Sequence, residues 1–255
     1  MSSVGGKVNS GHVIIGATSE IARAVARELA KEGGRLVVAA RDAKELALVA
    51  EDLRLRTGAD VTAMPLDVAA FETHEGFVNA CIAALGTVEG VVLAQGFMAD
   101  QQQAAADWPL ARQMIDVNFA SAVSLTNRFA THMAANGRGY ICGISSVAGD
   151  RGRQSNYLYG ATKAGFSAYL AGLRNRLYRS GVAVITVKPG FVDTSMTWGL
   201  LNPRSPLVAA PERVARDVGK AIRKRKNTVY TPWFWAIIML VIRLIPEPIF
   251  KRLSL

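Results

Sequence analysis

The fold is decided by one stretch near the amino terminus, His12-Val13-Ile14-Ile15-Gly16-Ala17-Thr18-Ser19-Glu20-Ile21-Ala22. Its apolar start predicts a buried strand, Gly16 a tight turn, and Ser19 the N-cap of a helix over residues 21–31. The free amide groups and the dipole at the start of such a helix can hold a pyrophosphate, so the stretch suits a dinucleotide. A three-glycine fingerprint would have glycine in place of Glu20 and Ala22, and an ordinary strand-to-helix turn uses the same residue types. The turn alone therefore leaves both interpretations open.

The alternation of strand and helix continues along the chain. Apolar runs rich in branched residues predict strands over residues 12–15, 35–40, 61–66, 90–94, 140–144 and 182–188. Segments of helical length lie between them. Short, continuously apolar strands are typical of a parallel sheet that helices cover on both faces. We therefore expect an α/β fold of Rossmann type, a doubly wound parallel sheet.

Length and composition bound the organisation of the chain. With 255 residues, 50% of them hydrophobic and 20% charged, one domain with a sizeable core is expected. We assign residues 1–230 to a nucleotide-binding catalytic domain and residues 231–255 to an apolar, basic tail of the same domain. Cys81 and Cys142 lie in apolar segments without metal-ligand spacing, so neither a disulfide framework nor a metal site is expected. Residues 1–10 have no apolar core like that of a secretory signal, which favours a cytoplasmic setting.

The charge of the chain is unusual, because 30 basic and 20 acidic residues give a net charge of +10. Residues 201–255 hold 11 of the basic and three of the acidic residues, and therefore +8 of the net charge. Such an excess of basic side chains can bind nucleic acid, an anionic membrane or an anionic ligand. The chain has no basic stripe interleaved with stacking aromatic residues, so no nucleic-acid partner is expected.

The residues after the second strand bear on the choice of dinucleotide. An acidic side chain there would bind the ribose hydroxyls of NAD, whereas an arginine would accommodate the 2′-phosphate of NADP. The chain has Arg41, which favours NADP. Asp42 suits either a ribose ligand or the cap of the next helix, so NAD stays open. Asp67 after the third strand and Gly96 after the fourth lie where this fold binds ligands, although each also suits a turn.

The chemistry is carried by the stretch Tyr159-Gly160-Ala161-Thr162-Lys163. On a helix, Tyr159 and Lys163 lie four residues apart on one face. A phenol has an ordinary pKa of about 10, and a nearby ammonium stabilises the phenolate, so the tyrosine becomes a usable acid and base. The alternative is an exposed Tyr/Lys pair, which many helices contain.

Two further features support the catalytic interpretation of Tyr159 and Lys163. Ser145 and Ser146 close the fifth strand, and Asn118 lies in the helical segment before it. Neighbouring residues in a strand point to opposite faces, so only one of the two serines should reach the cleft.

In order and spacing, these residues resemble the short-chain dehydrogenase/reductase family over about residues 12–230, with Lys188-Pro189-Gly190 after the sixth strand as a further likeness. The resemblance implies that Tyr159 donates a proton to the substrate carbonyl and that Ser146, the serine selected by the family's spacing, polarises it. It implies that Lys163 binds the nicotinamide ribose and lowers the pKa of the tyrosine. It also implies that Asn118 takes part in a proton relay.

The resemblance implies a cofactor cleft as well, with NADP(H) as the preferred cofactor and NAD(H) as the alternative. The residues expected to contact the cofactor are Gly16, Thr18, Ser19, Glu20, Ile21, Arg41, Asp67, Val68, Gly96, Tyr159, Lys163, Pro189, Gly190, Val192 and Thr194. The family's Asn-Asn-Ala-Gly segment is represented here by Leu93-Ala94-Gln95-Gly96. We expect this departure, with Glu20 and Ala22, to alter helix packing and cofactor affinity without abolishing activity, because the phosphate cradle uses backbone groups and the proton-transfer residues are intact.

The tail needs its own explanation. Residues 233–242 are ten uncharged apolar residues, and a helix of that length would be about 15 Å long, too short for a hydrocarbon core of about 30 Å. The tail can lie in a subunit interface, cover an apolar substrate or insert at a membrane surface. We favour membrane contact because residues 223–226, Arg243, Lys251 and Arg252 flank the apolar run and can bind anionic lipid.

Within the family, residues 149–153, 237–246 and 249–253 are similar to decaprenylphosphoryl-2-keto-ribose reductases. That subgroup reduces a keto-sugar carried on a polyprenyl phosphate, after a flavin oxidase has made the ketone. The resemblance therefore implies a lipid-linked ketone substrate and a flavin oxidase partner. Arg151, Arg153 and Arg204 are candidates for meeting the phosphate. We also expect a homo-oligomer that is peripheral on the inner face of the cell membrane.

These observations predict a NAD(P)H-dependent carbonyl reductase. A reductase of another apolar ketone, fatty-acyl or steroid-like, is the alternative substrate class. A non-catalytic cofactor-binding membrane scaffold is the alternative from a different functional class. A Ser/His/Asp hydrolase is excluded, because the sequence has no Gly-x-Ser-x-Gly elbow.

Overall fold

The computed structural model describes residues 11–31, 33–199, 202 and 205–253. In this part of the chain a seven-stranded sheet has the order β3-β2-β1-β4-β5-β6-β9, and all neighbouring strands are parallel. Its strands are β1 (Gly11–Ile15), β2 (Arg35–Ala40), β3 (Val61–Pro65), β4 (Val88–Leu93), β5 (Gly139–Ile144), β6 (Val182–Pro189) and β9 (Thr228–Thr231). The α/β fold predicted from the sequence, a doubly wound parallel sheet, is confirmed.

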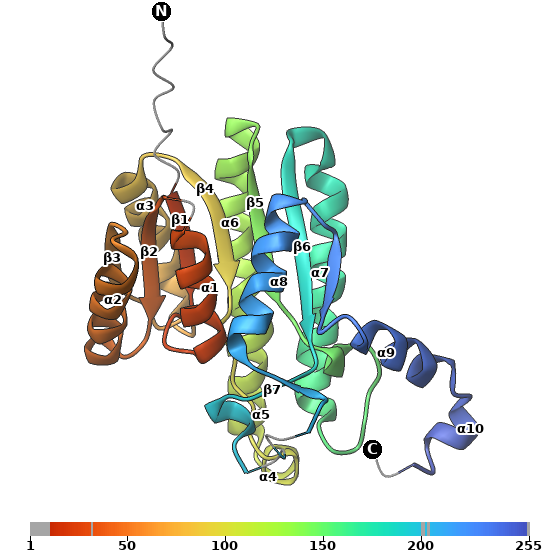
Figure 1. The fold of residues 1–255 in the computed structure, drawn as a ribbon. Helices are drawn as coiled ribbons and strands as arrows, with labels where there is room; N and C mark the ends of the chain where they lie inside the picture. Colours follow the sequence, from red (N-terminus) through yellow and green to blue (C-terminus); the bar gives the residue numbers. More distant parts are fainter. Residues whose placement is uncertain (1–10, 32, 200–201, 203–204, 254–255) are drawn as a thin grey trace, which may run out of the picture.

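Helices cover both faces of the sheet (Figure 1). One face carries α1 (Glu20–Ala30), α2 (Ala43–Thr57) and α8 (Pro211–Arg223), and the other carries α3 (His74–Leu85), α6 (Ser121–Asn136) and α7 (Tyr157–Leu177). Each layer encloses its own apolar core. Cys142 belongs to the core under α1 and α8, whereas Cys81 belongs to the core under α3 and α6, and both thiols are free and buried.

The helix boundaries follow from local capping. The Ser19 hydroxyl accepts a hydrogen bond from the Ala22 amide at 3.3 Å and so begins α1. The Asp42 carboxylate accepts hydrogen bonds from the amides of Lys44 and Glu45, both at 2.9 Å, and begins α2. Gly58 ends α2 with a φ of 68°, a conformation that glycine adopts without steric cost.

All six predicted strands are present, with ends that differ by at most two residues. The strand β9 was not predicted, because its sequence Thr-Val-Tyr-Thr has no continuous apolar run. The two short strands β7 (Phe191–Val192) and β8 (Val208–Ala209) form a separate pair and were also not predicted. Two-residue strands are too short for a periodic pattern to show.

The helices α4 (Gln101–Ala106) and α5 (Trp108–Ile115) lie at the carboxyl ends of the strands, at the bottom of Figure 1. The tail forms α9 (Trp235–Leu244) and α10 (Glu247–Phe250), which project to one side of the molecule. Within the described residues, no helix combines the length and the apolar character needed to cross a bilayer.

The structure corrects one part of the sequence argument about the tail. Residues 223–226 precede β9, and α9 follows it, so the basic run and α9 lie at opposite ends of that strand (Figure 1). The basic run therefore does not flank the apolar helix in space.

Candidate active site

The predicted catalytic side chains meet at the carboxyl ends of β4 and β5. Tyr159 and Lys163 lie on the first two turns of α7, and Ser146 is the second residue after β5. The Lys163 ammonium lies 5.6 Å from the centre of the Tyr159 ring and donates a hydrogen bond to the Ile144 carbonyl at 3.1 Å. The Ser146 side chain lies near enough to the Tyr159 hydroxyl to lower the pKa of the phenol. Three of the four predicted catalytic residues thus form one contiguous group.

Burial dominates the proton affinities of this group. It raises the pKa of the Tyr159 phenol to about 12, although the nearby Ser146 side chain acts in the opposite direction. Burial also lowers the pKa of the Lys163 ammonium to about 8. The expectation that the ammonium brings the tyrosine pKa towards neutral pH is not met in this structure, because burial is the largest influence on the pKa of Tyr159 and raises it. At neutral pH the tyrosine is therefore a protonated donor.

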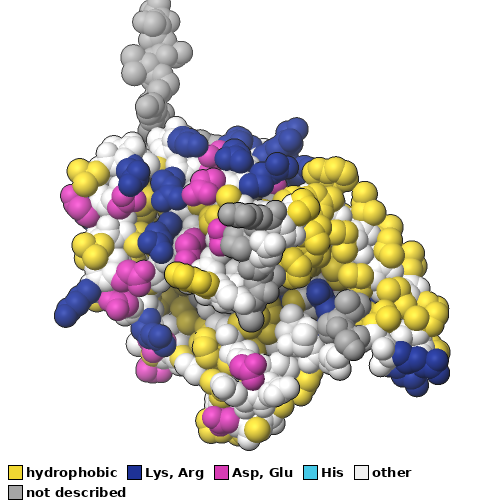
Figure 2. Space-filling view, turned by 60° about the horizontal axis from the view of Figure 1, so that its bottom comes forward, with side chains coloured by type: hydrophobic (Ala, Val, Ile, Leu, Met, Phe, Trp, Pro, Cys, Tyr) yellow, Lys and Arg dark blue, Asp and Glu magenta, His cyan; other side chains and the backbone are white. Residues whose placement is uncertain are grey.

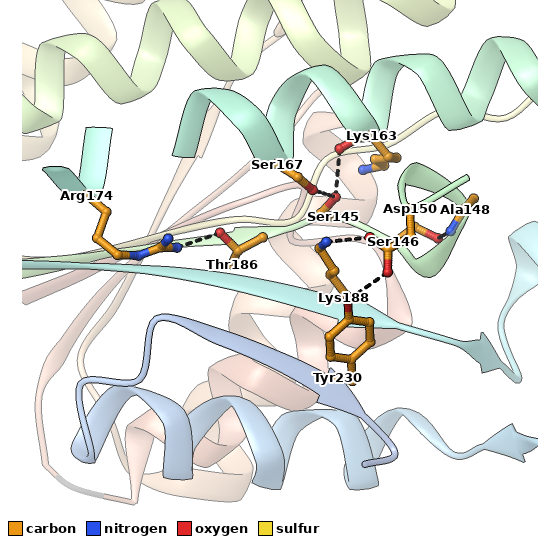
Figure 3. Close-up of polar contacts among 10 residues, drawn as sticks. All are labelled: Ser145, Ser146, Ala148, Asp150, Lys163, Ser167, Arg174, Thr186, Lys188 and Tyr230. Atoms are coloured by element: carbon orange, nitrogen blue, oxygen red, sulfur yellow. Dashed lines mark hydrogen bonds and ion pairs between the residues drawn. The ribbon is translucent and has the colours of Figure 1, made fainter. Parts of the chain in front are cut away.

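The two neighbouring serines have different roles (Figure 3). The buried Ser145 hydroxyl donates to the Lys163 backbone carbonyl at 3.0 Å and lies 2.7 Å from the Ser167 hydroxyl, so it fastens α7 to β5. The Ser146 hydroxyl accepts a hydrogen bond from the Ala148 amide at 3.1 Å and faces Tyr159. The two serines point in opposite directions, as alternation along a strand requires, and Ser146 is the one beside the tyrosine.

Asn118 is buried in a short π-helical segment (Asp116–Ala120) between α5 and α6. Its side-chain oxygen accepts from the Phe97 amide at 2.7 Å, and its side-chain nitrogen donates to the Phe97 carbonyl at 2.8 Å. A Cβ added at Gly96 would lie 3.7 Å from the Asn118 oxygen and 3.8 Å from the Lys163 nitrogen. Asn118 therefore holds the loop after β4 against the lysine.

The turn after β1 fits the phosphates of a dinucleotide. Gly16 has a φ of 82°, and a Cβ there would lie 2.5 Å from the backbone nitrogen of Gln95. Only glycine permits this close approach. Ala17, Thr18 and Ser19 then lead into the amino terminus of α1, where the helix dipole favours an anion. The side-chain oxygen and nitrogen of Gln95, in the adjoining loop after β4, are buried and have no hydrogen-bond partner. Because unpaired buried amides are unfavourable, this side chain is suited to a polar ligand in the cleft.

The residues expected to select the dinucleotide lie after β2 and β3. Arg41 is exposed directly after β2, and the cap that Asp42 forms on α2 supports the capping interpretation of that residue. The Asp67 carboxylate accepts from the Ala69 amide at 2.9 Å and so shapes the turn after β3, with Val68 half-buried beside it. An arginine without a competing ribose-binding acid next to it fits the 2′-phosphate of NADP.

The loop after β6 closes the opposite side of the cleft. Pro189 and Val192 are buried, and the Gly190 amide donates to the Thr231 carbonyl at 3.0 Å. Thr194 caps the short turn that follows, and its amide donates to the Thr197 hydroxyl at 3.2 Å.

Glu20 connects α1 to this loop, because its carboxylate accepts from the Ser195 amide at 3.0 Å and from the Ser195 hydroxyl at 3.4 Å. Burial of Glu20 opposes ionisation, yet the hydrogen bonds and Arg23 together hold the pKa of its carboxyl below the ordinary value. A hollow lies here between α1 and the loop, lined by Glu20, Asp193, Thr194, Ser195 and Trp198. Ile21, on the first turn of α1, is half-buried.

Sequence reasoning missed a network under the Ser146 loop (Figure 3). Asp150 pairs with the Lys188 ammonium and accepts a hydrogen bond from the Tyr230 hydroxyl at 2.7 Å. It also missed that the Trp235 indole of α9 packs where a Cβ of Gly190 would lie. No spacing rule links these residues, since 80 positions separate Asp150 from Tyr230. Among the described residues, no group of three or more His, Cys, Asp or Glu side chains is arranged to hold a metal ion.

Known proteins share both the sequence pattern and the fold. An uncharacterized oxidoreductase of Mycobacterium tuberculosis is 35% identical over 241 residues, which cover 94% of this chain and 96% of the relative. An uncharacterized oxidoreductase of Streptomyces coelicolor is 33% identical over 247 residues, with 94% of both chains covered.

The structure of an actinorhodin polyketide ketoreductase with NADPH is 25% identical and superimposes with a TM-score of 0.81, over 89% of this chain and 97% of that one. A 3-oxoacyl-[acyl-carrier protein] reductase from Brucella melitensis in complex with NAD has the same fold, with a TM-score of 0.80 at 24% identity and coverage of 90% and 98%. The pattern described as short chain dehydrogenase matches residues 12–204. With this match and the Ser146, Tyr159 and Lys163 group in place, the chain belongs to the short-chain dehydrogenase/reductase family of oxidoreductases.

Proposed function

We propose that this protein is an NADPH-dependent ketone reductase in which Tyr159 is the proton donor. The proposal is carried by the Tyr159 phenol, which lies beside Ser146 and has the Lys163 ammonium 5.6 Å from its ring centre, and whose pKa burial raises to about 12. A phenol with a pKa of about 12 holds its proton at neutral pH. It can therefore donate to a carbonyl oxygen but is a poor base towards an alcohol, so the group favours reduction.

The residues divide the chemistry as follows. When bound, the reduced nicotinamide supplies a hydride to the carbonyl carbon. The Tyr159 hydroxyl gives its proton to the carbonyl oxygen, so the C=O double bond becomes a C–OH group. The Ser146 hydroxyl donates a hydrogen bond to the same oxygen and polarises it. The Lys163 ammonium, 5.6 Å from the ring centre, stabilises the tyrosinate that remains after proton transfer. Asn118 holds the Gly96–Phe97 loop against Lys163.

The preference for NADPH over NADH rests on Arg41. Its side chain is exposed after β2, where the 2′-phosphate of NADP would lie, and a guanidinium binds phosphate with paired hydrogen bonds. Asp42 is engaged in capping α2 and does not compete for the ribose.

The substrate class is supported by the sequence of the tail. The likeness of residues 237–246 and 249–253 to decaprenylphosphoryl-2-keto-ribose reductases supports a keto-sugar on a polyprenyl phosphate, made by a flavin oxidase. Arg151 is no longer a candidate phosphate ligand, because its guanidinium donates hydrogen bonds to the carboxyl end of α9. Arg204 lies outside the described residues. Arg153 remains the candidate, since its Nε atom is buried without a hydrogen-bond partner.

The test is to titrate NADPH and NADH into the purified protein and then follow oxidation of the bound cofactor by a polyprenyl-phosphate keto-sugar. We expect NADPH to bind more tightly than NADH, and Arg41→Ser to remove most of that difference. Tyr159→Phe should lower kcat by about 10²–10⁴-fold while leaving NADPH binding intact. Unchanged turnover in Tyr159→Phe would refute the proton-donor role. Turnover of a free fatty-acyl or steroid-like ketone in place of the lipid-linked sugar would support the alternative substrate class.

A further inference from the structure

The tail helix α9 is apolar on two opposite faces. Its inner face is buried, since Trp235 and Met239 pack with Val147, Phe191 and Tyr230. Its outer face carries an apolar stripe at helical spacing, each side chain between 55% and 71% exposed: Ile237, Leu240, Val241 and Leu244. Scattered exposed apolar residues are ordinary, but a continuous stripe marks an interaction surface.

The stripe extends beyond α9. Trp233 just before the helix, Ile249 in α10 and Leu253 after it are also exposed. In Figure 2, hydrophobic side chains gather along the side of the molecule that α9 and α10 form. We call these seven residues the tail surface: Trp233, Ile237, Leu240, Val241, Leu244, Ile249 and Leu253.

The tail surface is held firmly on the catalytic domain. The Arg151 guanidinium donates to the carbonyls of Ile242 and Ile245, both at 2.6 Å, and so binds the carboxyl end of α9. The same guanidinium pairs with Glu247 at 3.0 Å and lies 3.7 Å from the centre of the Phe250 ring. Both helices of the tail are thereby fixed to the loop that follows Ser146, and the stripe is presented as a rigid surface.

Positive charge accompanies this surface. Over residues 233–253, Arg243, Lys251 and Arg252 stand against Glu247, a net charge of +2, and Glu247 is already paired with Arg151. Lys251 and Arg252 are exposed, and basic side chains lie at the outer tip of the tail in Figure 2. A second copy of the chain would bring another positive face against this one, whereas an anionic lipid headgroup neutralises it.

We propose that the tail surface docks on an anionic lipid bilayer, with α9 lying flat in the headgroup region and Lys251 and Arg252 on the lipid phosphates. A ten-residue helix about 15 Å long suits insertion parallel to the surface. Trp233 lies at the start of the stripe, and an indole is favoured at headgroup level. The inference stands on this surface alone and does not depend on the identity of the substrate.

The first experiment measures co-sedimentation of the full chain with phosphatidylglycerol-containing vesicles and with pure phosphatidylcholine vesicles. We expect strong binding to the anionic vesicles and weak binding to the neutral ones. The double variant Leu240→Glu/Leu244→Glu should lower the apparent affinity by at least roughly tenfold. The matched control is Leu48→Glu/Leu55→Glu on α2, where the original leucines are 73% and 78% exposed, and it should bind like the wild type.

A second pair of variants separates the two basic regions. Lys251→Glu/Arg252→Glu should lower the affinity for anionic vesicles by about tenfold or more, whereas Lys224→Glu/Lys226→Glu, at the far end of β9, should have a small effect. Thermal unfolding and NADPH binding of every variant provide the control for folding.

Two results would overturn the proposal. One is binding of the α9 variant to anionic vesicles as tightly as the wild type. The other is a wild-type dimer, measured by light scattering without lipid, that becomes a monomer in Leu240→Glu/Leu244→Glu, because the stripe would then be a contact between copies of the chain.

Discussion

Lys163 carries a buried positive charge, and this has a stability consequence that is separate from catalysis. Its pKa falls from 10.5 to about 8 because burial removes hydration, so the charged form is disfavoured by roughly 3 kcal/mol in the folded state. Between pH 8 and 10.5 the unfolded chain holds more protons than the folded one. Stability from this group therefore rises as the pH rises through that window, and the full penalty is present below pH 8.

We predict that Lys163→Met lowers ketone reduction by about 100-fold or more but raises the free energy of unfolding at pH 7 by about 1–2 kcal/mol. The gain is smaller than the penalty because the variant loses the hydrogen bond to the Ile144 carbonyl. Urea unfolding at pH 7 and pH 9.5 measures the gain in the free energy of unfolding, and this gain should be smaller at the higher pH. Lys44→Met, on the exposed surface of α2, is the control. A variant that is less stable than the wild type at pH 7 would contradict the interpretation.

At the level of single residues, the sequence predicts the relative positions of side chains that lie on the same helix or strand. The four-residue interval from Tyr159 to Lys163 and the alternation of Ser145 and Ser146 both gave the correct geometry, because helix and strand periods are fixed. The unpaired Gln95 amide and the Glu20–Ser195 contact were beyond sequence reasoning, since each depends on loops brought together from distant parts of the chain.

At the level of elements, the tail helix and the loop after β6 share one contact. Gly190 lies after β6, and a Cβ at that position would overlap the indole of Trp235 in α9. The loop can therefore take its course only because position 190 has no side chain. The sequence shows Gly190 as part of a Pro-Gly motif, but nothing in it points to a tryptophan 45 residues later.

We predict that Gly190→Ala displaces α9 and lowers the free energy of unfolding by about 1–3 kcal/mol, the usual range for overpacking. Limited proteolysis should show faster cleavage within the tail, and NADPH should bind more weakly. Gly172→Ala on α7 is the matched control, because a Cβ there meets nothing within 4 Å, and it should stabilise the protein slightly. Adding Trp235→Leu to Gly190→Ala should restore part of the loss. Equal stability of Gly190→Ala and the wild type would contradict this packing.

The elements that were predicted and those that were missed differ in length. Strands of five or more residues were recovered, and so were α1 and α2 with their caps Ser19 and Asp42, because apolar runs and caps are local signals. The four-residue strand β9 forms by pairing with β6, and its own sequence has no such local signal. For the same reason, the sequence placed residues 223–226 next to α9, although β9 separates them.

At the level of the whole molecule, Asp150 joins three parts of the chain that are distant in sequence. Its side chain is almost fully buried between Lys188 of β6 and Tyr230 of β9, and Arg151, the next residue, holds the tail. The loop after Ser146 is therefore the point at which the sheet edge, the tail and the candidate active site meet.

We predict that Asp150→Asn lowers the free energy of unfolding by about 3 kcal/mol, because the Lys188 ammonium is left buried without a counter-charge. Tyr230→Phe removes only one hydrogen bond and should lower it by about 1 kcal/mol. Urea unfolding of both single variants and the double variant gives the coupling between them, which should be non-zero because the groups touch. Additive effects of the two substitutions would show that the contact contributes nothing.

The two buried cysteines can serve as natural probes of local unfolding on the two sides of the sheet. Cys81 lies in one core layer and Cys142 in the other, and burial raises the pKa of both thiols to about 12, so neither is a reactive thiolate in the folded state. Each becomes available to an alkylating reagent only when its own layer separates from the sheet. Pulsed alkylation followed by peptide mass spectrometry would thus report the opening rate of each side of the sheet from a single unmodified sample. Equal rates would mean that the layers come apart together, and unequal rates would identify the layer that yields first.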